Sequence, residues 1–143
     1  MIAAPPAVAW ESLLGTVSSS FGGGFGRRFA RLLGCAEPVA TGDPATPGST
    51  VVGFRVAEAD PPRRLILEGR HRFSRYSLAF ELEPREGETR LAATTRATFP
   101  GLHGRAYRTL VIGSRAHVLV TRRLLDGIRR RAGRTRPDSR TGA

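Results

Sequence analysis

The stretch YSLAFELE, residues 76–83, alternates large apolar side chains with small or charged ones. In an extended chain, successive side chains point to opposite faces, so this alternation separates one apolar face from one polar face. Such a pattern is typical of a strand that packs on a core with one side and meets water with the other. The apolar face is expected to consist of Tyr76, Leu78, Phe80 and Leu82.

Strand patterns continue on both sides of this stretch. Upstream, residues 50–56 alternate in the same way, and after a turn at residues 60–62 a short apolar strand runs through residues 65–67. Downstream, Glu86 and Gly87 turn the chain into another alternating strand. Four strands joined by short turns predict an antiparallel meander with one face in water. The other residues expected to point inward are Val52, Phe54, Val56, Leu91, Ala93, Thr95, Ala97 and Phe99.

After the strands, the apolar period changes from two residues to about 3.6. Pro100 and Gly101 end the sheet, and residues 103–131 predict one long C-terminal helix. Residues 133–143 hold too few apolar side chains to pack, so we expect a disordered, arginine-rich tail after a domain of residues 1–132. The core stripe of the long helix is expected to be Tyr107, Leu110, Val111, Ser114, Val118, Thr121, Leu125 and Ile128.

Two short helices are expected before the sheet. Prolines 5–6 can begin the first helix, because the N–H that proline lacks has no partner in a first turn. The serines and glycines of residues 18–24 predict a break, and residues 25–33 again have helical spacing. The proline and glycine content of residues 36–49 predicts a loop. The buried face of the first helix is expected to be Trp10, Leu13 and Leu14.

Composition limits the class of protein. A chain of 143 residues is long enough for a single domain with one apolar core. Cys35 is the only cysteine, so neither an internal disulfide nor a cysteine metal cluster is expected, and we expect no cofactor. No stretch approaches the ~18 apolar residues of a membrane span, and the first residues lack the pattern of a secretion signal. The sequence therefore predicts a cytoplasmic protein without a membrane span.

The net charge of +11 suggests a nucleic-acid partner, but its distribution argues against one. Six arginines follow residue 128, so much of the excess charge belongs to the C-terminal end. Few aromatic side chains are available to stack on bases. The glycine run at residues 22–26 lacks the Lys-Ser/Thr ending of a phosphate loop. Binding of nucleic acid or an acidic partner through the arginine-rich end is kept as an alternative only.

The order of elements resembles the START-like superfamily, which includes polyketide cyclases and dehydrases. IAAPPAVAWESLL (2–14) is similar to its first-helix region, and GFRVAEADPPRRLILEG (53–69) to its strand, turn and strand. YSLAFELEP (76–84) and TRLAATTRATFPG (89–101) are similar to the hairpin that leads into the final helix. The family usually begins with a full strand, whereas only residues 1–4 precede the prolines here. We therefore expect either a short or missing first strand or a true start that lies upstream. An open sheet edge favours pairing with a partner or a second copy.

This resemblance implies an α+β helix-grip fold, in which a curved antiparallel sheet wraps around the long C-terminal helix. RFSRYSLAFELEP (72–84) and FPGLHGRAYR (99–108) resemble a branch defined only as a domain of unknown function. The resemblance also implies an apolar cavity between sheet and helix for a small hydrophobic molecule. The alternative is that the same side chains simply fill this space. The expected cavity walls are Phe54, Tyr76, Leu78, Phe80, Thr95, Tyr107, Val111, Ser114 and Val118.

Candidate catalytic groups are few, so the sequence leaves open whether the protein is an enzyme. Tyr76 and Tyr107 fall on inward faces, where a phenol can orient a ligand or donate a proton. His103, near the start of the long helix, is the best histidine candidate, and His71 lies between two arginines that disfavour its protonation. The rival to a binding module is therefore a cyclase or dehydratase acting on a polyketide-like substrate.

A basic patch on the strands offers a different kind of site. One or two of its guanidinium groups can bind a ligand carboxylate in bidentate fashion. The simpler interpretation, which the sequence favours, is a solvated sheet face whose charges Glu68, Glu81 and Glu83 balance. The patch consists of Arg70, Arg72, Arg75 and Arg96.

Overall fold

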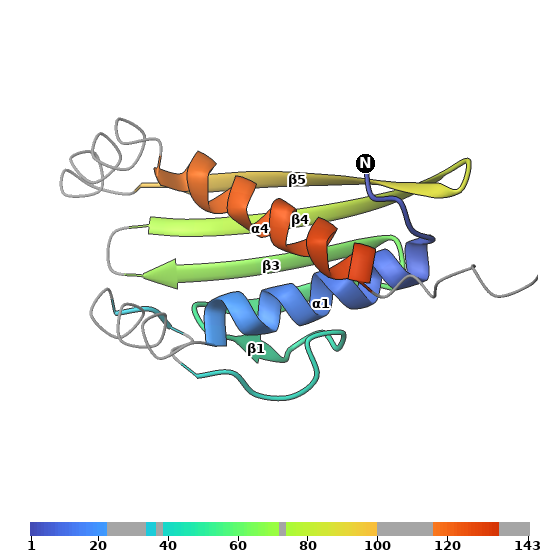
Figure 1. Cartoon of the computed structure of the whole chain (residues 1–143). Coiled ribbons are helices and arrows are strands. Elements are labelled where there is room, and N and C mark those ends of the chain that lie inside the picture. The colour runs from blue at the N-terminus through green and yellow to red at the C-terminus, as the bar shows by residue number, and fades with distance from the viewer. Residues whose placement is uncertain (23–33, 37–38, 72–73, 100–115, 135–143) are drawn as a thin grey trace, which may run out of the picture.

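The computed structural model describes residues 1–22, 34–36, 39–71, 74–99 and 116–134. Within them the chain forms two helices and five strands (Figure 1). The elements are α1 (Pro6–Gly22), β1 (Thr50–Val51), β2 (Phe54–Asp60), β3 (Arg64–His71), β4 (Ser74–Arg85), β5 (Glu88–Thr98) and α4 (Ala116–Arg134).

The sheet has the order β1-β2-β3-β4-β5, and every neighbouring pair is antiparallel. The predicted turns at residues 60–62 and at Glu86 and Gly87 connect strands as expected, and Gly87 has a positive φ of 71°. The α+β class and the antiparallel meander are therefore confirmed. The cross-strand register aligns Leu67, Leu78 and Thr95 on one face of β3, β4 and β5.

Helices α1 and α4 lie on the same face of the sheet, called here the inner face (Figure 1). On the opposite, outer face no described residue forms a helix. Alternation along the strands directs apolar side chains to the inner face, where the two helices cover them. This core includes the predicted Trp10, Leu13 and Leu14 of α1 and the following residues of the sheet and α4: Val56, Leu65, Leu67, Leu78, Phe80, Leu82, Leu124 and Ile128.

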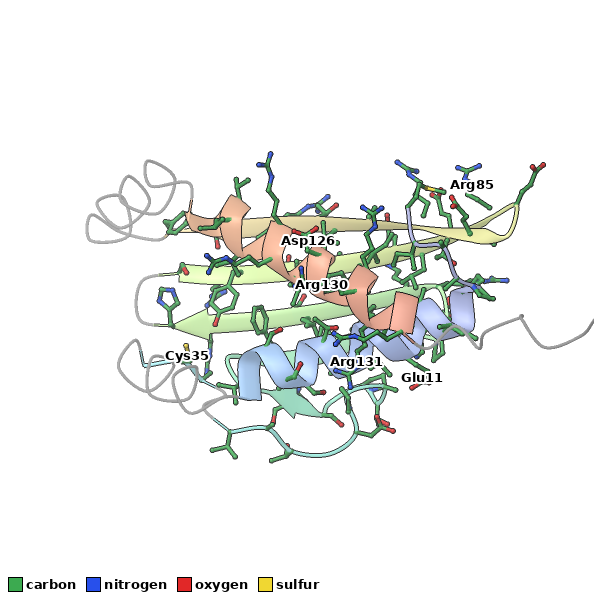
Figure 2. The ribbon with its side chains drawn as sticks, viewed as in Figure 1. Glu11, Cys35, Arg85, Asp126, Arg130 and Arg131 are labelled. Atoms are coloured by element: carbon green, nitrogen blue, oxygen red, sulfur yellow. The ribbon has the colours of Figure 1, made fainter. Side chains whose placement is uncertain are left out.

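Small residues let the two helices approach closely. The guanidinium of Arg131 lies over Gly15, where an added Cβ would stand 2.6 Å from Cζ of that arginine (Figure 2). At the same crossing, a Cβ on Gly127 would stand 3.1 Å from the methyl group of Thr16. The Arg131 guanidinium thus packs against α1 while the residue as a whole remains exposed.

The expected break at residues 18–24 is wrong in its first half, because α1 continues to Gly22. Hydroxyl groups inside the helix bond to the backbone of the preceding turn: Ser12 donates to the Val8 carbonyl at 2.8 Å and Thr16 to the Ser12 carbonyl at 2.7 Å. Such bonds let serine and threonine remain in a helix that tertiary packing stabilises. The predicted helix at 25–33 lies outside the described residues.

The single strand expected over residues 50–56 is also wrong. The chain turns at Val52 and Gly53, so that Thr50 and Val51 pair with Arg55 and Phe54. Gly53 has a φ of 86°, a conformation that glycine adopts without steric cost and that reverses the chain here. The result is a β-hairpin with a two-residue turn in place of one strand. Val52 is buried in this turn and does not pair with a neighbouring strand.

The described part of the C-terminal helix differs from its expected stripe. Ile128 is fully buried and Thr121 and Leu125 are half-buried, but Val118 is 36% exposed. Leu124 and Ala132, which lay outside the predicted stripe, are buried. The helix also continues to Arg134, three residues beyond the expected end. Tyr107, Leu110, Val111, Ser114 and residues 135–143 lie outside the described residues.

At the N-terminus, Ile2 forms an isolated antiparallel bridge with Thr89 of β5. Two backbone hydrogen bonds of 2.8 Å join these residues, and the Thr89 hydroxyl donates to the Ala4 carbonyl at 2.7 Å. A single bridge thus joins the N-terminal residues to β5. Among the described residues, neither helix combines the length and apolarity that crossing a membrane requires.

Candidate functional site

Aromatic and polar side chains gather at the end of the inner face where β3 joins β4. The ring centroids of Phe54 and Tyr76 lie 5.1 Å apart in an edge-to-face arrangement, and those of His71 and Tyr76 lie 5.6 Å apart. The Cys35 sulfur lies 3.7 Å from the Tyr76 hydroxyl. Ser74 and His71 share a hydrogen bond of 2.9 Å. We call these five residues the Tyr76 cluster.

Gly69 makes room for the Tyr76 ring. Gly69 is the register partner of Tyr76 on β3, and a Cβ there would collide with the ring and with the Gly53 carbonyl oxygen. The ring therefore crosses β3, and its hydroxyl donates to that carbonyl at 2.7 Å. Tyr76 thus ties the β1–β2 turn to the centre of the sheet, which is the structural role the sequence allowed for a buried tyrosine.

His71 and Ser74 close the hairpin between β3 and β4 as register partners. Both side chains lie on the inner face, and Ser74 is only 4% exposed. Partial burial lowers the pKa of His71 below its ordinary value of 6.5, so the imidazole is neutral at pH 7. The sequence predicted this direction from the flanking arginines, but the resolved cause is desolvation.

The predicted cavity walls divide into three groups. Phe54 and Tyr76 are half-buried in the Tyr76 cluster. Leu78 and Phe80 lie on the same face but are 7% and 0% exposed, because they belong to the core under the helices. Thr95 and Val118 are exposed, whereas Tyr107, Val111 and Ser114 lie outside the described residues, as does His103.

Exposure rises along β5 towards the Tyr76 cluster. The inner-face side chains Leu91 and Ala93 are half-buried, but Thr95 and Ala97 are exposed. Ala97 is the register partner of Tyr76. The first turn of α4 lies towards the same end of the sheet (Figure 1), and its Val118 is also exposed. Apolar surface from β5 and α4 therefore remains accessible beside the Tyr76 cluster.

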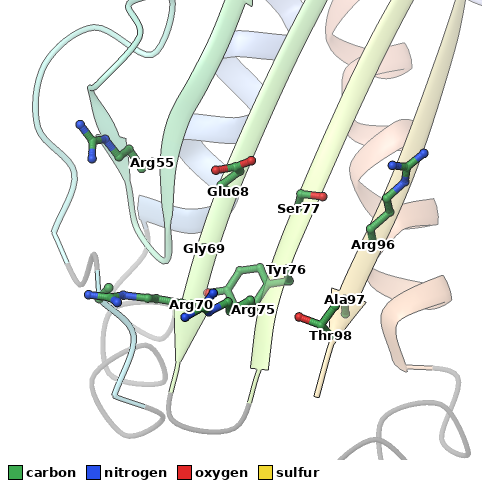
Figure 3. Close-up of a pocket in the computed structure, with 11 residues that line it drawn as sticks. Arg55, Glu68, Gly69, Arg70, Arg75, Tyr76, Ser77, Arg96, Ala97 and Thr98 are labelled. Atoms are coloured by element: carbon green, nitrogen blue, oxygen red, sulfur yellow. The ribbon is translucent and has the colours of Figure 1, made fainter. Parts of the chain in front are cut away.

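The outer face of the sheet carries a hollow of about 620 Å³ at the same end (Figure 3). Three of the four arginines predicted as a basic patch line it, namely Arg70, Arg75 and Arg96, whereas Arg72 lies outside the described residues. Arg55 joins them from β2. Sequence reasoning missed Arg55, because its place in the hollow is set by the register between β2 and β3. Sequence reasoning considered His71 but missed its neighbours Ser74 and Cys35, because no regular spacing along the chain links the three residues.

The described residues contain no group of three or more histidine, cysteine, aspartate or glutamate side chains suited to hold a metal ion. Comparison with family models, curated proteins and solved structures gives no match to this chain. The features that point to a function are therefore the Tyr76 cluster on the inner face and the arginine-lined hollow on the outer face.

Proposed function

We propose that the chain is a helix-grip domain of the START-like kind that binds a small hydrophobic molecule between the inner face of the sheet and α4. The gradient of burial along the inner face carries this proposal. Leu65, Phe80 and Leu82 are fully or almost fully buried, whereas Ala97 and Val118 at the other end are exposed. The order of the elements, with both helices on the inner face, supports the same assignment.

The chemistry of the exposed end suits an apolar ligand that contains a ring. Phe54 and Tyr76 offer aromatic edges and faces, and Ala97 and Val118 offer aliphatic surface. Ligand pockets combine such apolar walls with a few polar groups that orient the ligand. The Tyr76 hydroxyl is already bonded to the Gly53 carbonyl, and the Cys35 thiol shares a contact of 3.7 Å with that hydroxyl. The exposed Thr95 hydroxyl is therefore the group left to orient a ligand.

Native mass spectrometry of the freshly purified protein, compared with the denatured chain, tests for a bound molecule. Titration with an environment-sensitive apolar fluorophore then locates the site. Ala97→Trp fills the inner face beside Tyr76 and is expected to weaken fluorophore binding at least tenfold. Thr94→Trp adds the same ring to the outer face of the same strand and should leave binding unchanged. Equal effects of both variants, or an apo mass together with no fluorophore binding, would overturn the proposal.

A proton-transfer enzyme of cyclase or dehydratase type is the second candidate, and the His71–Ser74 pair favours it. Burial holds the imidazole neutral, so it can accept a proton from a carbon next to a carbonyl group. The test is exchange of the α-protons of a β-ketoacyl thioester in deuterated water, followed by NMR. Exchange lost in His71→Gln and kept in the outer-face control Thr94→Ser supports an enzyme. Exchange no faster than in buffer removes this candidate.

A further inference from the structure

The hollow on the outer face is built from two rows of side chains across the sheet. The register aligns Arg55, Glu68, Ser77 and Arg96 on four successive strands. Two residues further along the strands, it aligns Arg70, Arg75 and Thr98. The floor between these rows is the chain at Gly69, Tyr76 and Ala97. The Tyr76 and Ala97 side chains belong to the inner face. Figure 3 shows the rows from the outer side, with the helices behind the sheet.

The positive charge of this hollow exceeds its negative charge. Four guanidinium groups face one carboxylate, Glu68. None of Arg55, Arg70, Arg75 and Arg96 forms an ion pair with a carboxylate of the described residues. Elsewhere on the sheet, Arg64 pairs with Glu58, and Arg85 and Arg90 both pair with Glu83 at 3.1 Å. The arginines of the hollow thus differ from Arg64, Arg85 and Arg90, which form ion pairs with carboxylates on the strands.

Arg70 and Arg75 are direct register partners, with like charges on the same face of adjacent strands. Such a pair destabilises a sheet, since the Cβ atoms of directly opposite residues lie only ~5 Å apart. An anion between the two guanidinium groups removes this repulsion. Each planar group can also bind two oxygens of a phosphate in a fork-like arrangement.

The outer face is polarised along the strands. At the opposite end lie the carboxylates of Glu58, Asp60, Glu81, Glu83 and Glu88, interleaved with Arg64, Arg85 and Arg90. Fields of this kind raise the local concentration of a charged ligand at the end of opposite sign. An approaching anion is therefore directed towards the hollow.

We propose that this hollow binds a small, multiply charged anion of the diphosphate or triphosphate type. Arg70 and Arg75 hold one phosphate, and Arg55 and Arg96, three strand spacings or ~14 Å apart, contact the groups on either side. The volume of about 620 Å³ falls in the range of small-molecule sites. Glu68 and Ser77 lie between the outer arginines, where they accept hydrogen bonds from a hydroxyl or amino group of the ligand.

A concave site of this size favours a small molecule over a nucleic acid. A duplex or single strand would require cationic side chains along an extended surface, together with aromatic platforms for unpaired bases. Here the four arginines surround one hollow, and the aromatic ring of Tyr76 points away from it to the inner face. This proposal concerns the face opposite the hydrophobic site and stands whether or not that site binds a ligand.

Titration calorimetry with inorganic phosphate, pyrophosphate and tripolyphosphate at constant ionic strength tests the proposal. Affinity is expected to rise at least fivefold from phosphate to pyrophosphate. The double variant Arg70→Gln/Arg75→Gln should weaken pyrophosphate binding at least tenfold. The matched control Arg85→Gln/Arg90→Gln removes the same charge from β4 and β5 at the other end, and should change binding less than twofold.

The melting temperature supplies a second readout. Pyrophosphate should raise it in the wild type and in the control but not in the Arg70/Arg75 double variant. If that variant does not fold, Arg96→Gln alone should weaken binding severalfold. Equal weakening in test and control variants would reduce the effect to overall charge and overturn the proposal. If an oligonucleotide binds more tightly than tripolyphosphate and is not displaced by it, the ligand of this site is a nucleic acid and the small-anion proposal is overturned.

Discussion

The two ends of the inner sheet face differ although the same strands form both. At the packed end, Leu65, Phe80 and Thr89 are completely buried. At the Tyr76 end, the register partner of Tyr76 is the exposed Ala97, and the space above Gly69 is filled by an aromatic ring from the neighbouring strand. The alternation of side chains is the same at both ends. The depth of burial depends on where α1 and α4 cover the sheet, so a regular strand can supply both a core and an accessible site.

Removing a large ring should separate the two ends most clearly. Phe80→Ala leaves a cavity in the packed core and should lower the free energy of unfolding by about 3–5 kcal/mol. Phe54→Ala at the Tyr76 end removes a half-buried ring and should cost clearly less. Urea denaturation of both variants measures the difference. Equal losses would mean that the two ends are packed alike.

Adding one methyl group at the Tyr76 end should have the next largest effect. The new Cβ of Gly69→Ala collides with the Tyr76 ring and the Gly53 carbonyl, and such overpacking costs about 1–3 kcal/mol. Gly133→Ala on α4 meets no atom within 4 Å and should be neutral or slightly stabilising. Thermal melts of the two variants provide the comparison. An unchanged melting temperature for Gly69→Ala would show that the ring moves aside freely.

Deleting one hydroxyl group at the packed end and one at the Tyr76 end compares the hydrogen bonds of the two ends. Thr89→Val leaves the Ala4 carbonyl without its buried partner and should cost about 1–2 kcal/mol. Tyr76→Phe removes the bond to the Gly53 carbonyl at a half-buried position and should cost about 0.5–1 kcal/mol. Denaturant unfolding of the two variants measures both losses. A larger loss for Tyr76→Phe would reverse the assignment of packed and accessible ends.

The smallest expected effect is a pH dependence that arises at the Tyr76 end. Because burial lowers the pKa of His71, the unfolded chain binds a proton more readily than the folded chain. The stability contributed by neutral His71 is therefore complete above pH 6.5 and is lost as the pH falls towards the lower folded pKa. Melting temperatures measured from pH 8 to pH 5 should decline less in His71→Gln than in the wild type. Parallel curves would contradict this contribution.

Local chemistry explains which parts of the fold were predictable. The alternating residues 76–83 and the turn at Glu86 and Gly87 specify faces and reversals within a few residues, and the structure has both. The hairpin at Gly53 was missed because Val52, Phe54 and Val56 also fit a continuous strand. A positive φ at one glycine overrides that pattern, and the pattern alone does not reveal it.

The candidate sites were less predictable, because they depend on neighbours far apart in the chain. Tyr76 and Phe54 were expected on one face, and the structure places them in contact. His71 and Ser74 are close only because they pair across a hairpin. Arg55 and Arg96 line the same hollow only because the register of four strands aligns them in one row.

The sequence by itself determined the class of the protein, the direction of its side chains and most of its core, since these follow from local periodicity and turn chemistry. Tertiary structure decided the rest. It set how far α1 and α4 extend over the sheet, which apolar residues remain exposed, and that arginines from four strands surround one hollow. A two-residue period assigns each side chain to a face, but only packing and strand register determine what lies above or beside it on that face.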